Sequence, residues 1–203
     1  MLIEILAAVM IGYFIGAIPF ALVVGRVFYD TDIRNYGSGN LGGGNAGRVL
    51  GKKAGIVVMT LDILKVTIAI FLTSFFMNKD IAMIVAGLSA AAGHCFSVFA
   101  KFKGGKAVAT MYGFLFGMAL LGGYSFWIFF LPLIVFLAVL YLTKIIAMAS
   151  IASALVNTIY IYFVVGSIPL FISSMIFTVV IIVRHHKNIE RIVKHEENKI
   201  SWM

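Results

Sequence analysis

The feature that most limits what this chain can fold into is a series of long, uninterrupted apolar runs. Seven such runs, separated by short polar or glycine-containing segments, take up most of its 203 residues. A helix needs roughly 20 predominantly apolar residues to cross the hydrocarbon core of a bilayer. Because lipid offers no hydrogen bonds to the backbone, and because the apolar residues are continuous rather than alternating, helices are favoured over barrel strands. The sequence therefore predicts an all-α, polytopic integral membrane helical bundle of about seven transmembrane helices.

The predicted spans are Leu2 to about Phe28, Ala54–Met77, Ile81–Ala100, Ala107–Leu121, Tyr124–Leu142, Ile145–Val165 and Ile168–Val183. The fourth and seventh have only 15 and 16 residues, and the fourth is also compatible with half of a re-entrant element. Hydrophobic residues make up 62% of the chain, against roughly 45–50% in soluble domains, which excludes a soluble enzyme. We expect residues 1–203 to form a single transmembrane domain. Because Cys95 is the only cysteine, an intrachain disulfide is excluded.

Lysine and arginine residues alternate between the two ends of the predicted spans. Fourteen of the 16 fall at or after the ends of the first, third, fifth and seventh spans, whereas Lys79 lies on the opposite side and Lys65 inside a span. Because such residues collect in cytoplasmic loops, the pattern predicts an N-terminus outside and a C-terminus in the cytoplasm. A basic membrane face also attracts anionic lipid, so charge alone does not distinguish a topology signal from a binding site.

The first of three polar segments, residues 32–53, is rich in glycine. Glycine lets a backbone approach a ligand and turn its N–H groups inward as an anion-binding nest, and an arginine can hold a phosphate through two parallel hydrogen bonds. A flexible linker is the alternative, but a linker needs no polar side chains among its glycines. A dinucleotide site is rejected because no strand–turn–helix unit surrounds the glycines, and a Walker A loop is absent. The candidate residues are Ser38, Gly39, Asn40, Gly42, Gly43, Asn45, Arg48 and Lys53.

Two charged residues, Asp62 and Lys65, lie three positions apart on one face of the second predicted span. A lone lysine at the bilayer centre costs roughly 2.5–3.5 kcal/mol on insertion scales, so a partner is expected. The pair either fixes the span structurally or supports the site, and both interpretations stay open.

The second polar segment, residues 93–110, places Gly104 and Gly105 between Lys103 and Lys106, directly before a span. Backbone amides and a helix N-terminus backed by two ammonium groups resemble a phosphate cradle. Lys106 is the stronger candidate for ligand contact. His94, near the end of the preceding span, is expected to be a structural or site-supporting hydrogen-bonding residue.

The third polar segment covers residues 184–199. On a helix continuing from the last span, Arg184, Asn188 and Arg191 would share one face, and His185 would converge with Asn188. An amphipathic tail bound to anionic lipid is the alternative, but this mix of donors and bases suits an active site better. Glu197 is a further site-supporting candidate. We expect the three segments to meet at the inner leaflet in one anion-binding pocket beside the lipid tails.

Together the three segments resemble the three signatures of the bacterial acyl-phosphate-dependent glycerol-3-phosphate acyltransferases. The first is carried by Gly37-Ser-Gly-Asn-Leu-Gly with Asn45, Arg48 and Gly51-Lys-Lys; the second by His94-Cys-Phe-Ser-Val-Phe with Lys101-Phe-Lys-Gly-Gly-Lys106; the third by Arg184-His, Asn188-Ile, Arg191 and Glu197-Asn-Lys. The resemblance extends over essentially the whole chain. It departs from the family pattern where Gly43-Gly44 replaces Ala-Thr, Ser97 replaces Pro, Ala107 replaces Gly and His195 replaces Gly.

The resemblance implies an enzyme that transfers a fatty acyl group from acyl phosphate to the sn-1 hydroxyl of glycerol 3-phosphate. The products would be lysophosphatidic acid and phosphate, in the first acylation of phospholipid synthesis. The protein would be a multi-pass protein of the bacterial plasma membrane with its site on the cytoplasmic side. The implied catalytic residues are Ser38, Arg48, His185 and Asn188, with Lys106 also functional and the glycines of the second signature binding glycerol 3-phosphate. Acyl phosphate, glycerol 3-phosphate and membrane lipid would be the partners, without nucleic acid or an obligate protein partner.

Two other classes of protein were weighed against this enzyme. A transporter of phosphorylated small molecules would also use cations and glycine-rich breaks, but it places binding groups near the midplane and often has internal repeats, which this sequence lacks. A non-catalytic membrane scaffold would not need the polar clusters. The four histidines form no H-E-x-x-H pattern and have no cysteine partners, so no metal or other cofactor is expected. A His-x4-Asp pattern, typical of acyltransferases that use thioesters, is also absent, which favours acyl phosphate as the donor.

Overall fold

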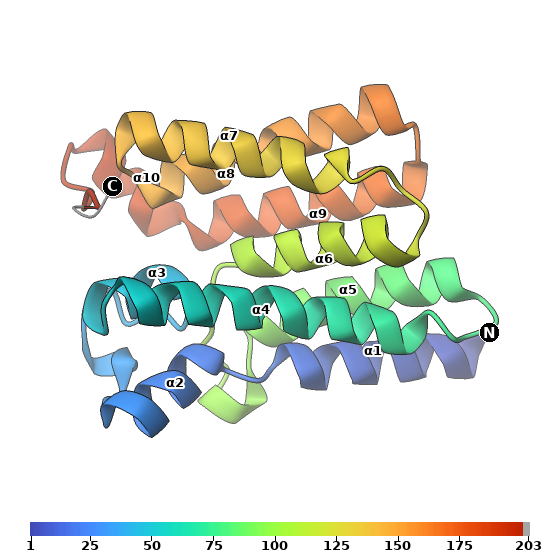
Figure 1. The fold of residues 1–203 in the computed structure, drawn as a ribbon, viewed down its shortest axis with the longest axis horizontal. Coiled ribbons are helices and arrows are strands. Elements are labelled where there is room, and N and C mark those ends of the chain that lie inside the picture. Colours follow the sequence, from blue (N-terminus) through green and yellow to red (C-terminus); the bar gives the residue numbers. More distant parts are fainter. Residues whose placement is uncertain (201–203) are drawn as a thin grey trace. The chain divides into compact units, whose positions relative to one another are not determined.

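A computed structural model describes residues 1–200, and every regular element over these residues is a helix (Figure 1). The chain divides into two compact units, Met1–Gly123 and Tyr124–Met203. Unit 1 contains α1 (Leu2–Gly16), α2 (Phe20–Tyr29), η1 (Ile33–Asn35), α3 (Gly43–Val49), α4 (Lys52–Thr73), α5 (Lys79–Cys95), η2 (Val98–Ala100) and α6 (Val108–Leu121). Unit 2 contains α7 (Trp127–Thr143), α8 (Ile146–Tyr160), η3 (Ile161–Val165), α9 (Ile168–Arg184) and α10 (His186–Val193). The all-helical fold is confirmed, and the single domain stays a prediction.

Each predicted span coincides with helix. Four helical stretches are long and apolar enough to cross a membrane, namely Leu2–Tyr29, Lys52–Thr73, Lys79–Ala100 and Ile146–Val165. The helix α9 passes the same test together with α10, which it meets at a bend of 58°, and α6 and α7 are shorter apolar helices. The exact number of spans and their orientation stay predictions.

The first predicted span contains a break that its apolar composition conceals. The helix α1 ends at Gly16, and α2 begins at Phe20 after Pro19. Proline has no backbone N–H and disfavours helical geometry at the residue before it, which accounts for the interruption at Ile18. The break matters for the site because it leaves the carbonyl groups at the end of α1 available to side chains from other helices.

The helices α1 and α5 pack closely because small residues face each other. A Cβ atom on Gly12 would collide with the backbone of Ala86, and one on Gly16 would collide with the backbone of Ala90. In lipid, where helix association relies on van der Waals packing, this small-xxx-small spacing lets backbones approach. Gly93 continues the close contact toward the end of α5, where the second polar segment begins.

The helices α4 and α6 of unit 1 run parallel. Gly113 of α6 lies against Ile63 and Val66, and Gly117, four residues later, lies against Ile70. The hydroxyl of Thr67 also donates a hydrogen bond to the carbonyl of Gly113 at 3.1 Å. By this register α6 begins at about the level of Leu61, so the loop before α6 lies toward the end of α4 that begins with Lys52.

In unit 2 a polar seam joins α8 to α9. The Asn157 amide donates to the Ser174 hydroxyl at 2.9 Å, and the Thr158 hydroxyl lies 2.8 Å from that of Ser174 and 2.9 Å from that of Thr178. Hydrogen bonds of this kind hold helices together in lipid.

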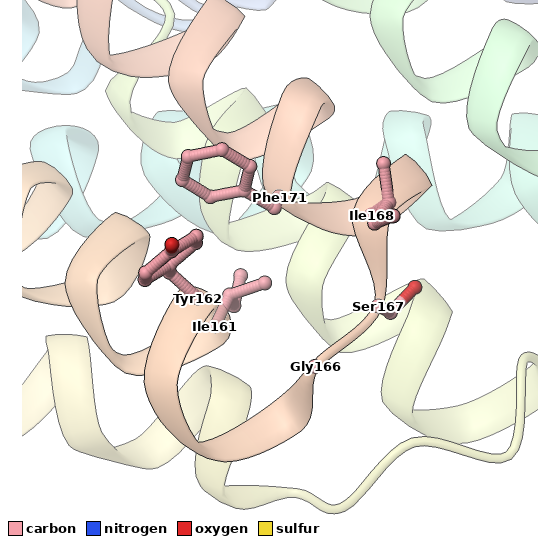
Figure 2. A pocket seen from close by; sticks show the side chains of 6 residues that line it. All are labelled: Ile161, Tyr162, Gly166, Ser167, Ile168 and Phe171. Carbon is pink, nitrogen blue, oxygen red and sulfur yellow. The ribbon is translucent and has the colours of Figure 1, made fainter.

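A small pocket of about 100 Å³ lies where η3 passes into α9 (Figure 2). Its lining is mainly apolar and consists of Ile161, Tyr162, Gly166, Ser167, Ile168 and Phe171. None of the residues predicted for the site lines it, so it does not bear on the chemistry argued below.

Candidate active site

The first polar segment is not wholly a loop. Residues Gly43–Val49 form α3, which packs against α4. A Cβ on Gly55 of α4 would lie 2.7 Å from the Cα of Gly47 and 2.9 Å from the carbonyl oxygen of Gly43. These three glycines therefore serve close helix packing. The expectation that the glycines of this segment mainly let the backbone approach a ligand is therefore too broad. It can hold only for the glycines that lie outside the contact between α3 and α4.

Asn45 shapes the loop that precedes α3. Its side chain is buried, and its Oδ1 atom accepts a hydrogen bond from the backbone N–H of Ser38 at 2.8 Å. Its Nδ2 atom donates to the carbonyls of Ile33 and Tyr36, each at 3.2 Å. Gly37, at a φ of 58°, occupies the left-handed region between these contacts. The structure thus places Asn45 as the residue that fixes the backbone around Ser38.

The cations of this segment differ in whether they are already paired. Asp32 accepts hydrogen bonds from Arg34, at 2.6 Å from Nη2, and from Arg26, at 2.9 Å from Nη2. Hydrogen bonding to Arg34 holds the pKa of the Asp32 carboxyl well below its usual range. Within residues 1–200, by contrast, the exposed Arg48 guanidinium and the Ser38 hydroxyl make no hydrogen bond or ion pair. A ligand can therefore use Arg48 and Ser38 without breaking an existing contact.

The remaining candidates of the first segment flank α3 in the sequence. Lys53 is exposed at the first turn of α4 and is likewise without a hydrogen-bond or ion-pair partner in the described part of the chain. Gly39 adopts a φ of 67°, and Gly42 immediately precedes α3. Asn40 is half-buried beside Gly42.

The second polar segment is anchored to the end of α1. The hydroxyl of Tyr13 donates to the carbonyl of Phe96 at 2.9 Å, and the buried hydroxyl of Ser97 donates to the carbonyl of Ala17. Because proline has no such hydroxyl, Ser97 supplies an anchor that the usual family residue lacks at this position. The segment then turns back so that the N–H of Gly105 donates to the carbonyl of His94 at 3.0 Å.

Gly104 and Gly105 are both buried, and both lie directly against His94. A Cβ on Gly104 would collide with the carbonyl of His94, and a Cβ on Gly105 would collide with its imidazole ring. Lys103 is exposed, and Lys106 is half-buried immediately before α6. Glycine is thus required at both positions by packing alone, a signal that the sequence pattern does not reveal.

A cluster of buried charges lies beneath this loop. The Lys65 ammonium lies 2.6 Å from Oδ1 of Asp62, 3.0 Å from Nδ1 of His94 and 2.9 Å from the carbonyl of Ile18. Asp62 and Lys65 are 1% and 2% exposed, so water reaches neither charge. The predicted Asp62–Lys65 pair therefore forms, and it includes His94 as a third member.

The first two polar segments lie beside the same stretch of α4. Gly43 at the start of α3 lies against Met59 of α4. The loop that ends at Lys106 leads into α6, which begins at about the level of Leu61 on the same helix. Both regions thus lie beside α4 near Met59 and Leu61, and their meeting in one anion-binding pocket stays a prediction.

The third polar segment folds as a hinge within unit 2. The helix α9 ends at Arg184 and α10 begins at His186, so the expectation of one continuous helix is wrong. The rings of His185 and His186 accompany the break, since each ring places Nδ1 within 3.0 Å of a carbonyl in the last turn of α9. For His185 the acceptor is Ile181 at 2.8 Å, which puts the proton of the neutral ring on Nδ1 and the lone pair on Nε2.

Glu197 joins the two other polar residues of this hinge. Its Oε1 atom accepts from Nδ2 of Asn188 at 2.6 Å, and its Oε2 atom accepts from Nε of Arg191 at 2.6 Å. Arg184 is half-buried at the end of α9. Because this segment belongs to unit 2, its convergence with the first two segments stays a prediction.

No set of three or more His, Cys, Asp or Glu side chains in residues 1–200 is grouped in a way that could ligate a metal ion. Cys95 is buried beside His94.

Comparison with known proteins decides the family. The family model described as glycerol-3-phosphate acyltransferase matches residues 6–195. The chain belongs to this family. It is 44% identical over 195 residues to the glycerol-3-phosphate acyltransferase of Bacillus subtilis (strain 168), covering 96% of this chain and 97% of that one. The corresponding protein of Geobacillus kaustophilus (strain HTA426) is 43% identical, covering 95% and 94%.

The fold agrees with a solved member of the glycerol-3-phosphate acyltransferase family. The crystal structure of PlsY, an integral membrane glycerol 3-phosphate acyltransferase, in its glycerol 3-phosphate form has a TM-score of 0.87 with this chain at 30% identity. The match covers 97% of this chain and 96% of that one, and the lysophosphatidic acid form gives a TM-score of 0.85. With its apolar helices, the chain is accordingly a membrane protein of a family with bacterial members.

The departure from the family pattern at Ala107 leads to a prediction. Ala107 adopts a φ of 61° and a ψ of 4°, a left-handed conformation that costs a residue with a Cβ roughly 1–2 kcal/mol. Replacing Ala107 by glycine should therefore raise the free energy of unfolding by about 0.5–1 kcal/mol, after the greater freedom of glycine in the unfolded chain is subtracted. Thermal unfolding in detergent measures the change. The control Ala109→Gly, inside α6, should lower the melting temperature, and a fall for both variants would contradict the strain argument.

Proposed function

We propose that the chain transfers a fatty acyl group from acyl phosphate to the sn-1 hydroxyl of glycerol 3-phosphate. The products are lysophosphatidic acid and inorganic phosphate. The observation that carries the proposal is membership of the glycerol-3-phosphate acyltransferase family over residues 6–195, which include the first two polar segments and residues 184–195 of the third. The reaction is the first acylation of phospholipid synthesis, and we place its site at the cytoplasmic face of a bacterial plasma membrane.

Both substrates carry a phosphate, so the site must hold two anions. Ser38 and Arg48 hold one phosphate, since their polar groups have no partner among residues 1–200 and Arg48 can bind two phosphate oxygens at once. The loop of Gly104 and Gly105, with the Lys106 ammonium, holds the other. Both Lys53 and Lys103 are exposed; Lys53 adds positive charge near the first phosphate and Lys103 near the second.

The chemical step needs no covalent enzyme intermediate. The sn-1 oxygen attacks the acyl carbonyl carbon, the bond from that carbon to the phosphate oxygen breaks, and the hydroxyl proton leaves. Acyl phosphate is a mixed anhydride with a good leaving group, so positioning and charge stabilisation supply most of the rate enhancement. Arg48 and Lys106 stabilise the negative charge that develops on the departing phosphate and on the carbonyl oxygen.

His185 and Asn188 orient the attacking hydroxyl. The Nδ1–H of His185 is directed to the carbonyl of Ile181, so the lone pair on Nε2 can accept the hydroxyl proton. Asn188 is held by Glu197, which fixes its amide for a second contact. A phosphate oxygen of the substrate is the alternative base. Arg184 and Arg191 flank these two residues and add charge.

An assay of the purified chain in detergent tests the proposal. With acyl phosphate and glycerol 3-phosphate, and with a metal chelator present, phosphate release should match lysophosphatidic acid formation mole for mole. Acyl-CoA and acyl carrier protein thioesters should not replace acyl phosphate. Lysophosphatidic acid formed from a thioester alone would refute the donor, and uptake of glycerol 3-phosphate into liposomes without acyl transfer would favour a transporter.

A further inference from the structure

The buried cluster of Asp62, Lys65 and His94 is linked to the loop that the proposed function assigns to a substrate phosphate. The link is direct, because the carbonyl of His94 accepts the N–H of Gly105 at 3.0 Å and the ring of His94 fills the space that a side chain on Gly105 would need. A displacement of His94 would therefore displace Gly105.

The orientation of His94 is in turn set by Lys65. Nδ1 of His94 lies 3.0 Å from Nζ of Lys65 and 3.5 Å from Oδ1 of Asp62; because an ammonium group can only donate, the shorter contact with Lys65 assigns Nδ1 as the acceptor. The neutral ring then carries its proton on Nε2, the atom that lies beside Gly105. Lys65 itself is held by Asp62 at 2.6 Å and by the carbonyl of Ile18 at 2.9 Å.

Stability alone does not account for this cluster. Replacing a buried ion pair by apolar residues of similar volume is often neutral or stabilising, because the desolvation cost of two charges offsets their attraction. The cost is also high within a predicted membrane span. A cluster that orients a third residue, by contrast, needs both charges. Lys65 orients His94, and Asp62 keeps Lys65 in place.

We propose that Asp62, Lys65 and His94 are positioning residues. They hold Gly104, Gly105 and Lys106 in the conformation that binds the phosphate of glycerol 3-phosphate, an inference that rests on the proposed function. The cluster reaches the substrate through His94 and the loop, without touching it. Its loss should therefore weaken binding of glycerol 3-phosphate more than it lowers stability.

The first test removes both charges together. The double variant Asp62→Leu/Lys65→Met leaves neither charge unpaired, so it should keep a melting temperature within a few degrees of wild type. Calorimetric titration with glycerol 3-phosphate, without an acyl donor, should show a dissociation constant roughly tenfold higher or more, because the apparent affinity falls with the fraction of molecules whose loop is in the binding conformation. The matched control Thr67→Val removes a buried bond from α4 to Gly113 and should lower the melting temperature while leaving the dissociation constant unchanged.

The second test does not depend on that double variant folding. Gly105→Ala should weaken glycerol 3-phosphate binding in the wild type because the new methyl group collides with the His94 ring. In a His94→Ala background the space is open, so adding Gly105→Ala should cost less than threefold. An equal cost in both backgrounds would overturn the proposal, since the glycine would then be required by the ligand rather than by His94.

The outcomes separate this inference from the function on which it rests. A wild-type chain that binds no glycerol 3-phosphate and transfers no acyl group would refute the proposed function together with the positioning role. A wild-type chain that binds and turns over, with a folded Asp62→Leu/Lys65→Met variant that binds equally well, would overturn the positioning role alone. In both cases the dissociation constant for glycerol 3-phosphate, measured for the wild type and the double variant, distinguishes the outcomes.

Discussion

Replacing Arg48 by alanine is expected to lower kcat/KM by about 100- to 1000-fold, the effect typical of removing one preorganised donor to a developing negative charge. The guanidinium is exposed and without a partner in residues 1–200, so its removal should leave the fold intact. Arg48→Lys keeps the charge but loses the two parallel hydrogen bonds, so it should lie between wild type and Arg48→Ala. Steady-state rates with varied acyl phosphate and glycerol 3-phosphate measure the effect and show which substrate Arg48 holds.

Arg26 provides the matched control for this experiment. It is also an exposed arginine of unit 1, but its guanidinium is bound to Asp32 at 2.9 Å, and Asp32 keeps Arg34 when Arg26 is removed. Arg26→Ala should therefore change kcat/KM less than threefold. Equal losses for Arg26→Ala and Arg48→Ala would mean that net positive charge, rather than the placement of Arg48, is what the reaction uses.

His185→Ala is expected to lower kcat by about 100- to 10,000-fold if its Nε2 atom accepts the hydroxyl proton. The neighbouring His186 is the control, because its ring is exposed and also contacts a carbonyl of α9, at 3.0 Å from Val183. His186→Ala should keep near-normal turnover. Near-normal turnover in His185→Ala would remove His185 from the mechanism.

The pH dependence of kcat separates the two candidate bases. If His185 is the base, the loss of rate toward acid pH should disappear in His185→Ala along with most of the activity. If a substrate phosphate is the base, the acid limb should persist in the variant, with His185 acting only to orient the hydroxyl. Rates measured between pH 5 and pH 9 in the same detergent would distinguish the two.

The spans were predictable because continuous apolar composition is a property of the sequence itself. Their interruptions were less so. The break at Pro19 has a sequence signal, but the one at His185 is accompanied by two imidazole rings that bind carbonyls of the preceding turn. Helix α3 was missed because glycine-rich segments have a low intrinsic helix propensity, and here packing of Gly43 and Gly47 against Gly55 overrides it.

The residue types of the site were predictable, but their partners were not. The pairing of Asp62 with Lys65 follows from their spacing on a helix. The contact of Lys65 with the Ile18 carbonyl was not predictable, because every residue type has a backbone carbonyl. In the same way the candidate Asn45 uses its amide to hold the loop backbone, a set of partners that the residue type alone does not predict.

In the proposed function unit 1 holds the phosphates of both substrates, one at Ser38 and Arg48 and the other at the loop of Gly104, Gly105 and Lys106. A crystal structure of the chain with glycerol 3-phosphate and a non-transferable phosphonate analogue of acyl phosphate tests this most directly. We expect one anion within hydrogen-bonding distance of Arg48 and the other within that distance of Lys106. Two anions bound elsewhere, with Arg48 and Lys106 contacting neither, would contradict it.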